Sequence, residues 1–405
     1  MFEEIVTELR LSPSELEDIK TAKAPKEQYC PYFEVCGGCQ LLTWPYDKQV
    51  EWKKNQLKEV FKSKDDIDFL SADQVTLYRH KNSISFKQHH TQIIAGFYKP
   101  KSHQLININH CVIQHPVAEK IFLSLKDLMK KNRIEPFDED RLTGVLRHAL
   151  VRVSKHTNQV LLTLVVGQTP YPGRKNFIAA IRKAHPEITT IIENYHPIKS
   201  SYLLGKKEDV VFGRGFIQEK LNDKVFSIQS RTFFQIHIDQ AERLFNEVIQ
   251  YSDLKPTDVC IDAYAGVGVI GMLMSDKVKT VISVESNPDS VQLAKRNAEF
   301  NGIKNIQFVQ KDATEWIKNS TQAFDVLVMD PPREGAGYTF MDTIAQKKPN
   351  TIIYISCNPV TQAKDLLQLS KSYMVVKRFG VDLFPQTIHV EAIILMTRIG
   401  SVEKK

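Results

Sequence analysis

The chain has 405 residues, of which 42% are hydrophobic and 25% are charged, and its formal net charge is +7. This length is too great for one core of ordinary size, and the composition is that of a globular protein. The first twenty residues are charged throughout, unlike a secretory signal, and no later run approaches a membrane span. We therefore expect a cytoplasmic protein whose six cysteines are ligands, nucleophiles or core residues.

The first candidate site is a group of cysteines near the N-terminus. Cys30, Cys36 and Cys39 are spaced C-x5-C-x2-C, and two glycines in the last interval let the backbone turn tightly enough for two thiolates to face one centre. Cys111 is the next cysteine along the chain and would complete a tetrahedral set. Four thiolates suit either zinc or an iron–sulfur cluster, and the spacing does not choose between them. Three unrelated thiols are the plainer alternative.

The pattern then changes from helical to β-like. Residues 46–64 place apolar side chains at helical spacing with lysines on the other face, which predicts an amphipathic helix. From about residue 75 to residue 220, short runs of alternating and β-branched residues predict a separate, mostly antiparallel β domain, interrupted by a helix over 118–131.

Basic and aromatic residues are interleaved at two places in this β region. Such mixtures stack bases and neutralise phosphates, in keeping with the positive charge, but they also occur on ordinary sheet surfaces. The residues concerned are Tyr78, Arg79, His80, Lys81 and Phe86 in the first segment and Phe97, Tyr98, Lys99 and Lys101 in the second.

From residue 224 onward, strands and helices alternate as in a doubly wound sheet. Helices are expected over 239–251 and 288–301. The expected strands are 259–266, 280–286, 306–313, 324–332, 351–359, 374–385 and 391–399.

Two features of this half indicate a nucleotide-like cofactor. A glycine turn at Gly266 follows the first strand, and Glu285 ends the second, where an acid can bind a ribose hydroxyl pair. These features alone would suit NAD or S-adenosylmethionine (SAM). SAM is favoured because the turn lacks the third glycine of the dinucleotide fingerprint, and because strand four ends in Asp330 followed by two prolines.

The fifth strand ends in a thiol. Cys357 precedes Asn358 and Pro359, and this proline opens the next helix at its first turn. Ligands bind at the carboxyl edge of such sheets, which favours a reactive thiol, whereas most free cysteines are buried core residues. Glu391 lies just before the last, strongly apolar strand and is expected near the same edge.

Together these residues resemble those of the SAM-dependent RNA uracil-C5 methyltransferases, the TrmA/RumA/RumB family. The resemblance covers nearly the whole chain. The matching segments are the four cysteines, YRHKNSISF, GFYKPKSH, LRHALVR, TFFQ (232–235), DAYAGVG (262–268), DPPREG (330–335), SCNP (356–359) and HVEAI (389–393).

The resemblance implies an α/β fold in three parts: an N-terminal iron–sulfur segment (1–74), a central β-rich RNA-binding domain (75–222) and a seven-stranded Rossmann-like SAM methyltransferase domain (223–405). It implies a [4Fe–4S] cluster on Cys30, Cys36, Cys39 and Cys111, the last supplied by the central domain. The SAM contacts that it implies are Gln235, Tyr264, Gly266, Glu285, Asp330 and Asp312. It makes Cys357 the nucleophile and Glu391 the general base.

These two residues imply covalent catalysis at a weakly nucleophilic carbon. The Cys357 thiolate adds to uracil C6, C5 attacks the SAM methyl group, and Glu391 removes the C5 proton before the thiolate leaves. The thiol must have a lowered pKa or lose its proton on binding, and the N-terminus of the helix at Pro359 is expected to help. The target base must be unpaired or flipped out of its stack.

The cluster motif favours 23S ribosomal RNA as the substrate, and methylation of uridine 54 in tRNA is the alternative. A non-catalytic iron–sulfur RNA-binding protein is disfavoured by the intact Cys357, Glu391 and Asp330, and a cytosine-C5 enzyme by the lack of a cysteine after the Asp-Pro-Pro motif. We expect a monomer.

Three features depart from the family pattern. Val269 and His237 stand where many relatives have asparagine, and neither change touches the chemistry. The segment before Cys30 is too short for the small RNA-binding barrel (TRAM) of several members, so the chain is most similar to the barrel-less rRNA members.

Overall fold

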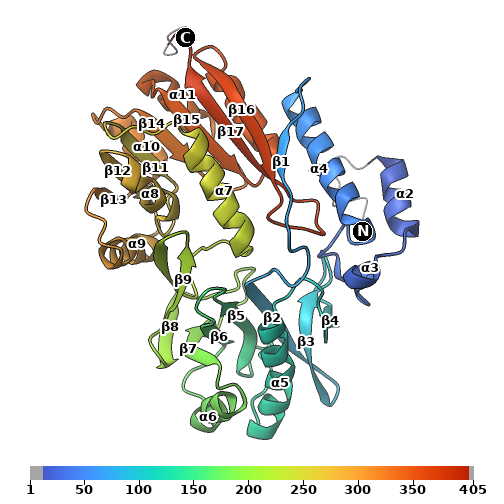
Figure 1. Ribbon diagram of the computed structural model, residues 1–405. Helices are drawn as coiled ribbons and strands as arrows, with labels where there is room; N and C mark the ends of the chain where they lie inside the picture. Colours follow the sequence, from blue (N-terminus) through green and yellow to red (C-terminus); the bar gives the residue numbers. More distant parts are fainter. Residues whose placement is uncertain (1–11, 401–405) are drawn as a thin grey trace.

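Two large β-sheets, one above the other in Figure 1, organise residues 12–400, the part of the chain that this computed structural model describes. The upper sheet comes almost entirely from the C-terminal half of the chain, and the lower sheet from residues 81–212. The N-terminal helices lie beside the upper sheet. The expected change from a β-rich middle to an alternating α/β half is confirmed.

Within the described residues the upper sheet has eight strands in the order β1-β16-β17-β15-β14-β11-β12-β13. Neighbouring strands are parallel, except that β17 is antiparallel to both β15 and β16. The strands are β1 (Asp68–Leu70), β11 (Val259–Ala263), β12 (Thr280–Glu285), β13 (Ile306–Gln310), β14 (Val326–Met329), β15 (Thr351–Ser356), β16 (Tyr373–Val381) and β17 (Glu391–Arg398). The seven expected strands are confirmed, whereas β1 was not expected, because three residues are too few to show an alternating pattern.

Helices cover both faces of this sheet, as a doubly wound fold requires. Apolar side chains of α7, α8 and α9 pack on one face, and those of α10, α11 and α12 on the other. These helices and a short 3₁₀ turn are α7 (Ile238–Tyr251), α8 (Val269–Met274), η2 (Ser275–Lys277), α9 (Pro288–Phe300), α10 (Ala313–Asn319), α11 (Tyr338–Lys347) and α12 (Pro359–Leu369). Asn287 and Asn358 cap α9 and α12 by accepting N–H groups of the first turn, and a proline follows each cap.

The lower sheet has seven strands in the order β4-β3-β2-β5-β6-β7-β8 within residues 12–400. The strands are β2 (Lys81–His89), β3 (Gln92–Tyr98), β4 (Leu105–Asn107), β5 (Leu146–Val153), β6 (Val160–Val166), β7 (Ile188–Tyr195) and β8 (Lys207–Phe212). All pairs are antiparallel except β6–β7, so the expectation of a mostly antiparallel sheet is confirmed.

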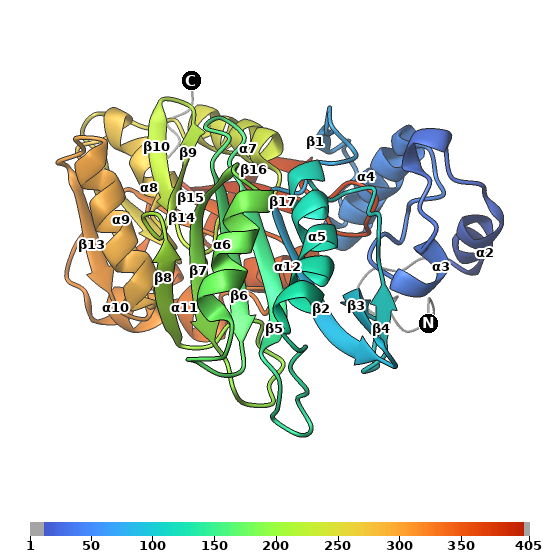
Figure 2. The same ribbon diagram turned by 90° about the horizontal axis from the view of Figure 1, so that it is seen from below.

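Two helices cover one face of the lower sheet (Figure 2). The helix expected over 118–131 is α5 (Pro116–Asn132), and α6 (Arg174–Ala184) was not expected. α6 connects β6 to β7, and parallel neighbours need such a crossover, so the one parallel pair explains the second helix.

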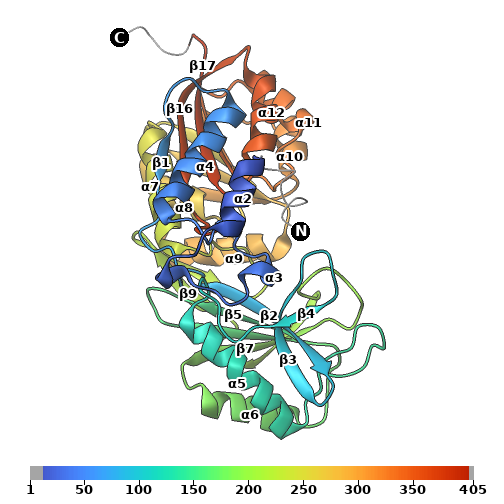
Figure 3. The same ribbon diagram turned by 90° about the vertical axis from the view of Figure 1, so that its right-hand side faces the viewer.

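The N-terminal segment consists of α2 (Pro13–Thr21), η1 (Lys26–Gln28), α3 (Phe33–Cys36) and α4 (Tyr46–Phe61). α4 lies close to α12 and β16, on the flank of the upper sheet (Figure 3). A hairpin of β9 (Ile217–Leu221) and β10 (Lys224–Ile228) leads from the lower sheet to α7, and the expected boundary at 222/223 falls in its turn. No helix between residues 12 and 400 combines the length and the apolar character needed to cross a bilayer.

Candidate active site

Cys357 and Glu391 meet at the edge of the upper sheet where its parallel strands end. Cys357 follows β15, and Glu391 is the first residue of β17. Because β17 is antiparallel to β15, with Ser356 opposite Ala392, the next position places Cys357 across from Glu391. Asp330 follows the neighbouring strand β14 and ends at the same edge. The strand order therefore gathers the predicted nucleophile, the predicted base and one predicted SAM contact.

Burial and like charge favour the protonated forms of both predicted catalytic groups. The pKa of the Cys357 thiol is raised to about 11, first by burial and then by the charges of Glu391 and Asp330, while Arg333 opposes the shift. Burial, followed by the charge of Asp330, raises the pKa of Glu391 well above its usual range. α12 begins at Pro359 as predicted. The raised pKa in the free enzyme is compatible with the expectation that the thiol loses its proton on binding.

One pocket collects four of the predicted SAM contacts. Gln235, Tyr264, Gly266 and Asp330 all line it, around the turn that follows β11. Tyr264 has a φ of +62°, a left-handed conformation that few residues with a Cβ adopt. Val269 lines the same pocket, so an apolar side chain occupies the place where many relatives have asparagine.

The other two predicted SAM contacts lie beside this pocket. The Glu285 carboxylate accepts the Gly266 N–H at 2.9 Å and the Asn287 N–H at 2.7 Å, which fixes the acid against the glycine turn. Asp312 caps α10. Burial raises the pKa of Tyr264 to about 12, and the charge of Asp312 adds to the shift, so these two side chains are neighbours.

Two charged residues of the site were not singled out from the sequence. Asp262 is 2% exposed, accepts the Gly271 N–H at 3.0 Å, and has a pKa raised to about 7, chiefly by burial. Its charge adds to the burial that raises the pKa of Asp330 to about 7. Arg333 donates to Nδ1 of His389 at 3.0 Å. The signals that could have identified Asp262 and Arg333 were their places inside the DAYAGVG and DPPREG motifs.

Cys30, Cys36, Cys39 and Cys111 lie in the same region of the fold, and three of them, Cys30, Cys39 and Cys111, pack against one small hydrophobic cluster. Burial raises the pKa of the Cys39 thiol, and the charges of Cys111, Cys36 and Cys30 raise it further, so the four thiols share one neighbourhood. All the donors are thiols, the set that zinc and iron–sulfur clusters take. Their arrangement is looser than a ligand sphere: within residues 12–400, no three Cys, His, Asp or Glu side chains are placed to hold a metal ion.

Some of the aromatic residues in the interleaved basic and aromatic segments belong to the protein core. Tyr78 and Phe86 are 1% and 2% exposed, so the interpretation of these rings as base-stacking groups is wrong in this structure. His237, one of the departures from the family pattern, stacks on Tyr78 with ring centroids 4.7 Å apart. Tyr98 and Lys101 are exposed and stay candidates for RNA contact.

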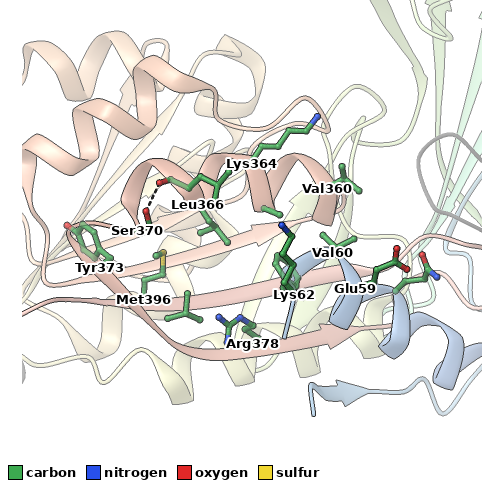
Figure 4. A pocket seen from close by; sticks show the side chains of 15 residues that line it. Glu59, Val60, Lys62, Val360, Lys364, Leu366, Ser370, Tyr373, Arg378 and Met396 are labelled. Carbon is green, nitrogen blue, oxygen red and sulfur yellow. Dashed lines mark hydrogen bonds between the residues drawn. The ribbon is translucent and has the colours of Figure 1, made fainter. Parts of the chain in front are cut away.

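A larger hollow, of about 630 Å³, lies away from these residues (Figure 4). It is bounded by the end of α4, by α12 and by β16 and β17, and none of the predicted site residues lines it. Val60, Leu366 and Met396 make it largely apolar, with Lys62 and Arg378 among its polar lining residues. The pocket at the sheet edge, and not this hollow, is the candidate active site.

Comparison with known protein families gives a match over most of the chain. A family model described as tRNA (Uracil-5-)-methyltransferase matches residues 45–399. An uncharacterised RNA methyltransferase of Halalkalibacterium halodurans is 33% identical over 381 residues, which cover 91% of this chain and 83% of that protein. An uncharacterised RNA methyltransferase of Staphylococcus aureus is 34% identical over 376 residues, which cover 90% of this chain and 83% of that protein.

A solved structure shares the architecture. The crystal structure of Pyrococcus abyssi tRNA (uracil-54, C5)-methyltransferase in complex with S-adenosyl-L-homocysteine matches with a TM-score of 0.75 and 25% sequence identity. The match covers 90% of this chain and 86% of that chain.

Proposed function

Since this chain belongs to the tRNA (uracil-5-)-methyltransferase family and is a SAM-dependent RNA methyltransferase, we propose that it methylates uridine C5 through a covalent bond between Cys357 and uracil C6. The observation that carries the proposal is the strand register that sets Cys357 across from Glu391. The pocket lined by Asp330 lies at the same edge. A thiol and a carboxyl group beside a cofactor pocket are the groups that this reaction needs.

The reaction balances with these residues alone and one methyl donor. The Cys357 thiolate forms an S–C6 bond, and the C5=C6 electron pair becomes an enolate with C5 as its nucleophilic carbon. SAM supplies an electrophilic methyl group, C5 forms a bond to it as the sulfonium S–CH3 bond breaks, and S-adenosylhomocysteine leaves. Glu391 then accepts the C5 proton, the C5=C6 bond forms again, and the S–C6 bond breaks.

Because the pKa values of Cys357 and Glu391 are raised, the residues around them must favour the charged forms before the reaction can proceed. Cys357 must lose its proton to add, and Glu391 must be ionised to accept one. Arg333 lowers the pKa of both groups against the effect of burial, so we assign to it the stabilisation of both charged forms. The SAM contacts that we propose are Gln235, Tyr264, Gly266, Glu285, Asp330 and Asp312, which line the pocket or lie beside it.

The RNA substrate that we propose is 23S ribosomal RNA, on the resemblance of the cysteine motif. A tRNA uridine is the second candidate, because the Pyrococcus abyssi enzyme that shares this architecture is a tRNA (uracil-54, C5)-methyltransferase. We also propose that the chain divides into three domains, 1–74, 75–222 and 223–405, and that the second of these contacts RNA. We propose further that the enzyme is monomeric and acts in the cytoplasm.

A trapping experiment tests mechanism and substrate together. Fluorine at C5 blocks the final proton removal, so an enzyme that uses the covalent route stays bonded to 5-fluorouridine RNA. With SAM present, we expect a slower band on a denaturing gel with a 23S fragment and none with Cys357→Ala. A band with tRNA but not with the 23S fragment would identify tRNA, and not 23S RNA, as the substrate. No band with either RNA would contradict the covalent route.

We propose that Cys30, Cys36, Cys39 and Cys111 hold a [4Fe–4S] cluster, in support of which their thiols share one neighbourhood. The methyl transfer requires no electron transfer to or from a redox centre, so this cluster would have a structural role. Protein purified without oxygen should be brown and contain iron and sulfide at about four per chain. Stoichiometric zinc instead would contradict the proposal.

A further inference from the structure

The loop that leads into Glu391 is held by a distant part of the chain. This base-bearing loop, residues 382–390, connects β16 to β17. Gln386 near its middle has a φ of +72°, a left-handed conformation that is unfavourable for a residue with a Cβ. Such a conformation persists where the surroundings over-determine it. The N-terminal segment supplies those surroundings.

Gln49 of α4 fixes Gln386 by two hydrogen bonds. Its side-chain N–H donates to the Gln386 side-chain oxygen at 2.8 Å, and its own oxygen accepts the Gln386 backbone N–H at 2.9 Å. Both side chains are fully buried. The Leu41 N–H donates to the Gln386 carbonyl oxygen at 3.0 Å, so three polar groups of one residue are bound from the N-terminal side.

Lys53, one turn further along α4, fixes the start of the loop. Its Nζ lies 2.8 Å from a carboxylate oxygen of Asp382 and donates to the Phe384 carbonyl at 3.1 Å. Both members of this ion pair have fully buried side chains. The Tyr46 hydroxyl donates to the other carboxylate oxygen at 3.1 Å. A buried charge that lost its partner would be strongly unfavourable, so this contact strongly resists opening.

Gln40 and Tyr78 also hold the base-bearing loop, and Gln40 connects it to the turn between Cys36 and Cys39. The Gln40 side chain accepts the Ile388 N–H at 3.3 Å and donates to the Gly37 carbonyl at 2.7 Å. The Tyr78 hydroxyl donates to the Pro385 carbonyl at 3.0 Å. Gln40, Gln49, Lys53 and Tyr78 are called the brace below.

We propose that the brace is a positioning device for proton removal: it holds the base-bearing loop so that Glu391 faces the C5 proton of the adduct. The inference rests on the proposed function. Glu391, the first residue of β17, pairs with Val381, the last residue of β16, and such end pairs fray readily when the adjoining chain is not held. Cys357 directly follows β15 and lies outside the braced loop, so nucleophilic addition does not depend on the brace.

The test separates the two steps. Gln49→Met removes both side-chain bonds to Gln386 at nearly constant volume, and Lys54→Met is the matched control on α4, where Lys54 makes only a surface pair with Asp66. Adduct formation on ordinary uridine RNA, adduct breakdown and SAM binding are measured separately. A tritium label at C5 reports proton removal.

In Gln49→Met we expect adduct breakdown and tritium release to slow by roughly tenfold to a hundredfold, the effect of two lost hydrogen bonds, so that adduct accumulates on ordinary RNA. Adduct formation and SAM binding should stay within about twofold of the unmodified enzyme, and Lys54→Met should behave normally. Equal loss of formation and breakdown, or a normal rate of breakdown, would overturn the inference.

A second variant covers the case in which Gln49→Met does not fold. Tyr78→Phe removes only the hydroxyl that holds Pro385 and keeps the ring stacked on His237. It should slow breakdown in the same direction, and unchanged breakdown would contradict the brace. Failure of the proposed function is distinguishable, because the unmodified enzyme would then form no adduct at all.

Discussion

At Cys357 the surroundings that exclude water also oppose the charged form that the reaction needs. Burial, Glu391 and Asp330 raise the pKa of its thiol, and the positive charge of Arg333 lowers it. A raised pKa here is consistent with a nucleophile that stays unreactive until the RNA arrives. Perturbed groups that cluster in one pocket are typical of functional sites.

Replacing the base should trap the intermediate. In Glu391→Gln the C5 proton has no acceptor, so we expect adduct with ordinary uridine RNA to accumulate and product release to fall by at least about a hundredfold. Denaturing gels and methyl incorporation measure the two quantities. Cys357→Ala is the control that should show neither adduct nor product. Normal turnover by Glu391→Gln would assign the base elsewhere.

The pH profile should follow the raised pKa values. The pKa of Cys357 is raised to about 11 and that of Glu391 is raised as well, and both groups must lose a proton, so kcat/KM for RNA should rise with increasing pH. Arg333→Ala removes the charge that lowers both pKa values, and should move the profile to higher pH.

Lys364→Ala, which removes an exposed charge on α12, is the control for that change and should leave the profile in place. A profile that falls with pH in the unmodified enzyme would contradict the assigned protonation states.

At the scale of the elements, the direction of β17 determines which residues meet at the candidate active site. The other strands next to the site run parallel and present their carboxyl ends, whereas β17 runs the other way and presents its first residue. An acid at the start of a strand therefore meets a thiol at the end of another. In the lower sheet, the parallel pairing of β6 and β7 likewise accounts for α6, because parallel neighbours need a crossover connection between them.

The turn between Cys36 and Cys39 should tolerate no side chain at Gly37. Its φ is +67°, and a Cβ there would lie 2.6 Å from Cγ of Pro100. Gly302 also has a φ of +67° but has open space around its Cβ position, so Gly302→Ala reports the backbone strain alone.

We expect Gly37→Ala to lose most of the iron of the proposed cluster and to lower the melting temperature more than Gly302→Ala, with SAM binding retained in both. Iron analysis and thermal melting measure this difference. Equal effects of the two substitutions would show that the contact with Pro100 does not matter.

At the scale of the molecule, two sheets are joined through packing and polar contacts. Leu161 and Ile192 of the lower sheet pack into the core of the upper one, and Lys155 forms an ion pair with Asp239 at the start of α7. The N-terminal segment supplies β1 and three of the four brace residues to the upper sheet, and the fourth is Tyr78. The three sequence regions thus share cores and hydrogen bonds.

The net charge of +7 predicts RNA binding that depends on salt. Lys and Arg side chains that neutralise phosphates release bound counterions, so the logarithm of the RNA affinity should fall linearly with the logarithm of the salt concentration. Filter binding at several salt concentrations measures the slope. Binding of S-adenosylhomocysteine is the control and should change little, and RNA affinity independent of salt would contradict phosphate contact.

The sequence alone determined the succession of the main strands in the C-terminal half, the glycine turn, the family and the candidates Cys357, Glu391 and Asp330. These features are local, since periodicity, caps and motifs are written in neighbouring residues. It also assigned Tyr78 and Phe86 to possible base stacking, and their burial shows that exposure is not a local property.

The tertiary structure alone decided which residues meet. Gln49 and Gln386 stand 337 positions apart, and nothing in either neighbourhood predicts their contact. The antiparallel course of β17, the pairing of β1 and the raised pKa of Cys357 likewise arise from chain segments distant in sequence. Strand direction, burial and electrostatic fields depend on the sum of these distant contacts, and that sum exists only in the folded chain.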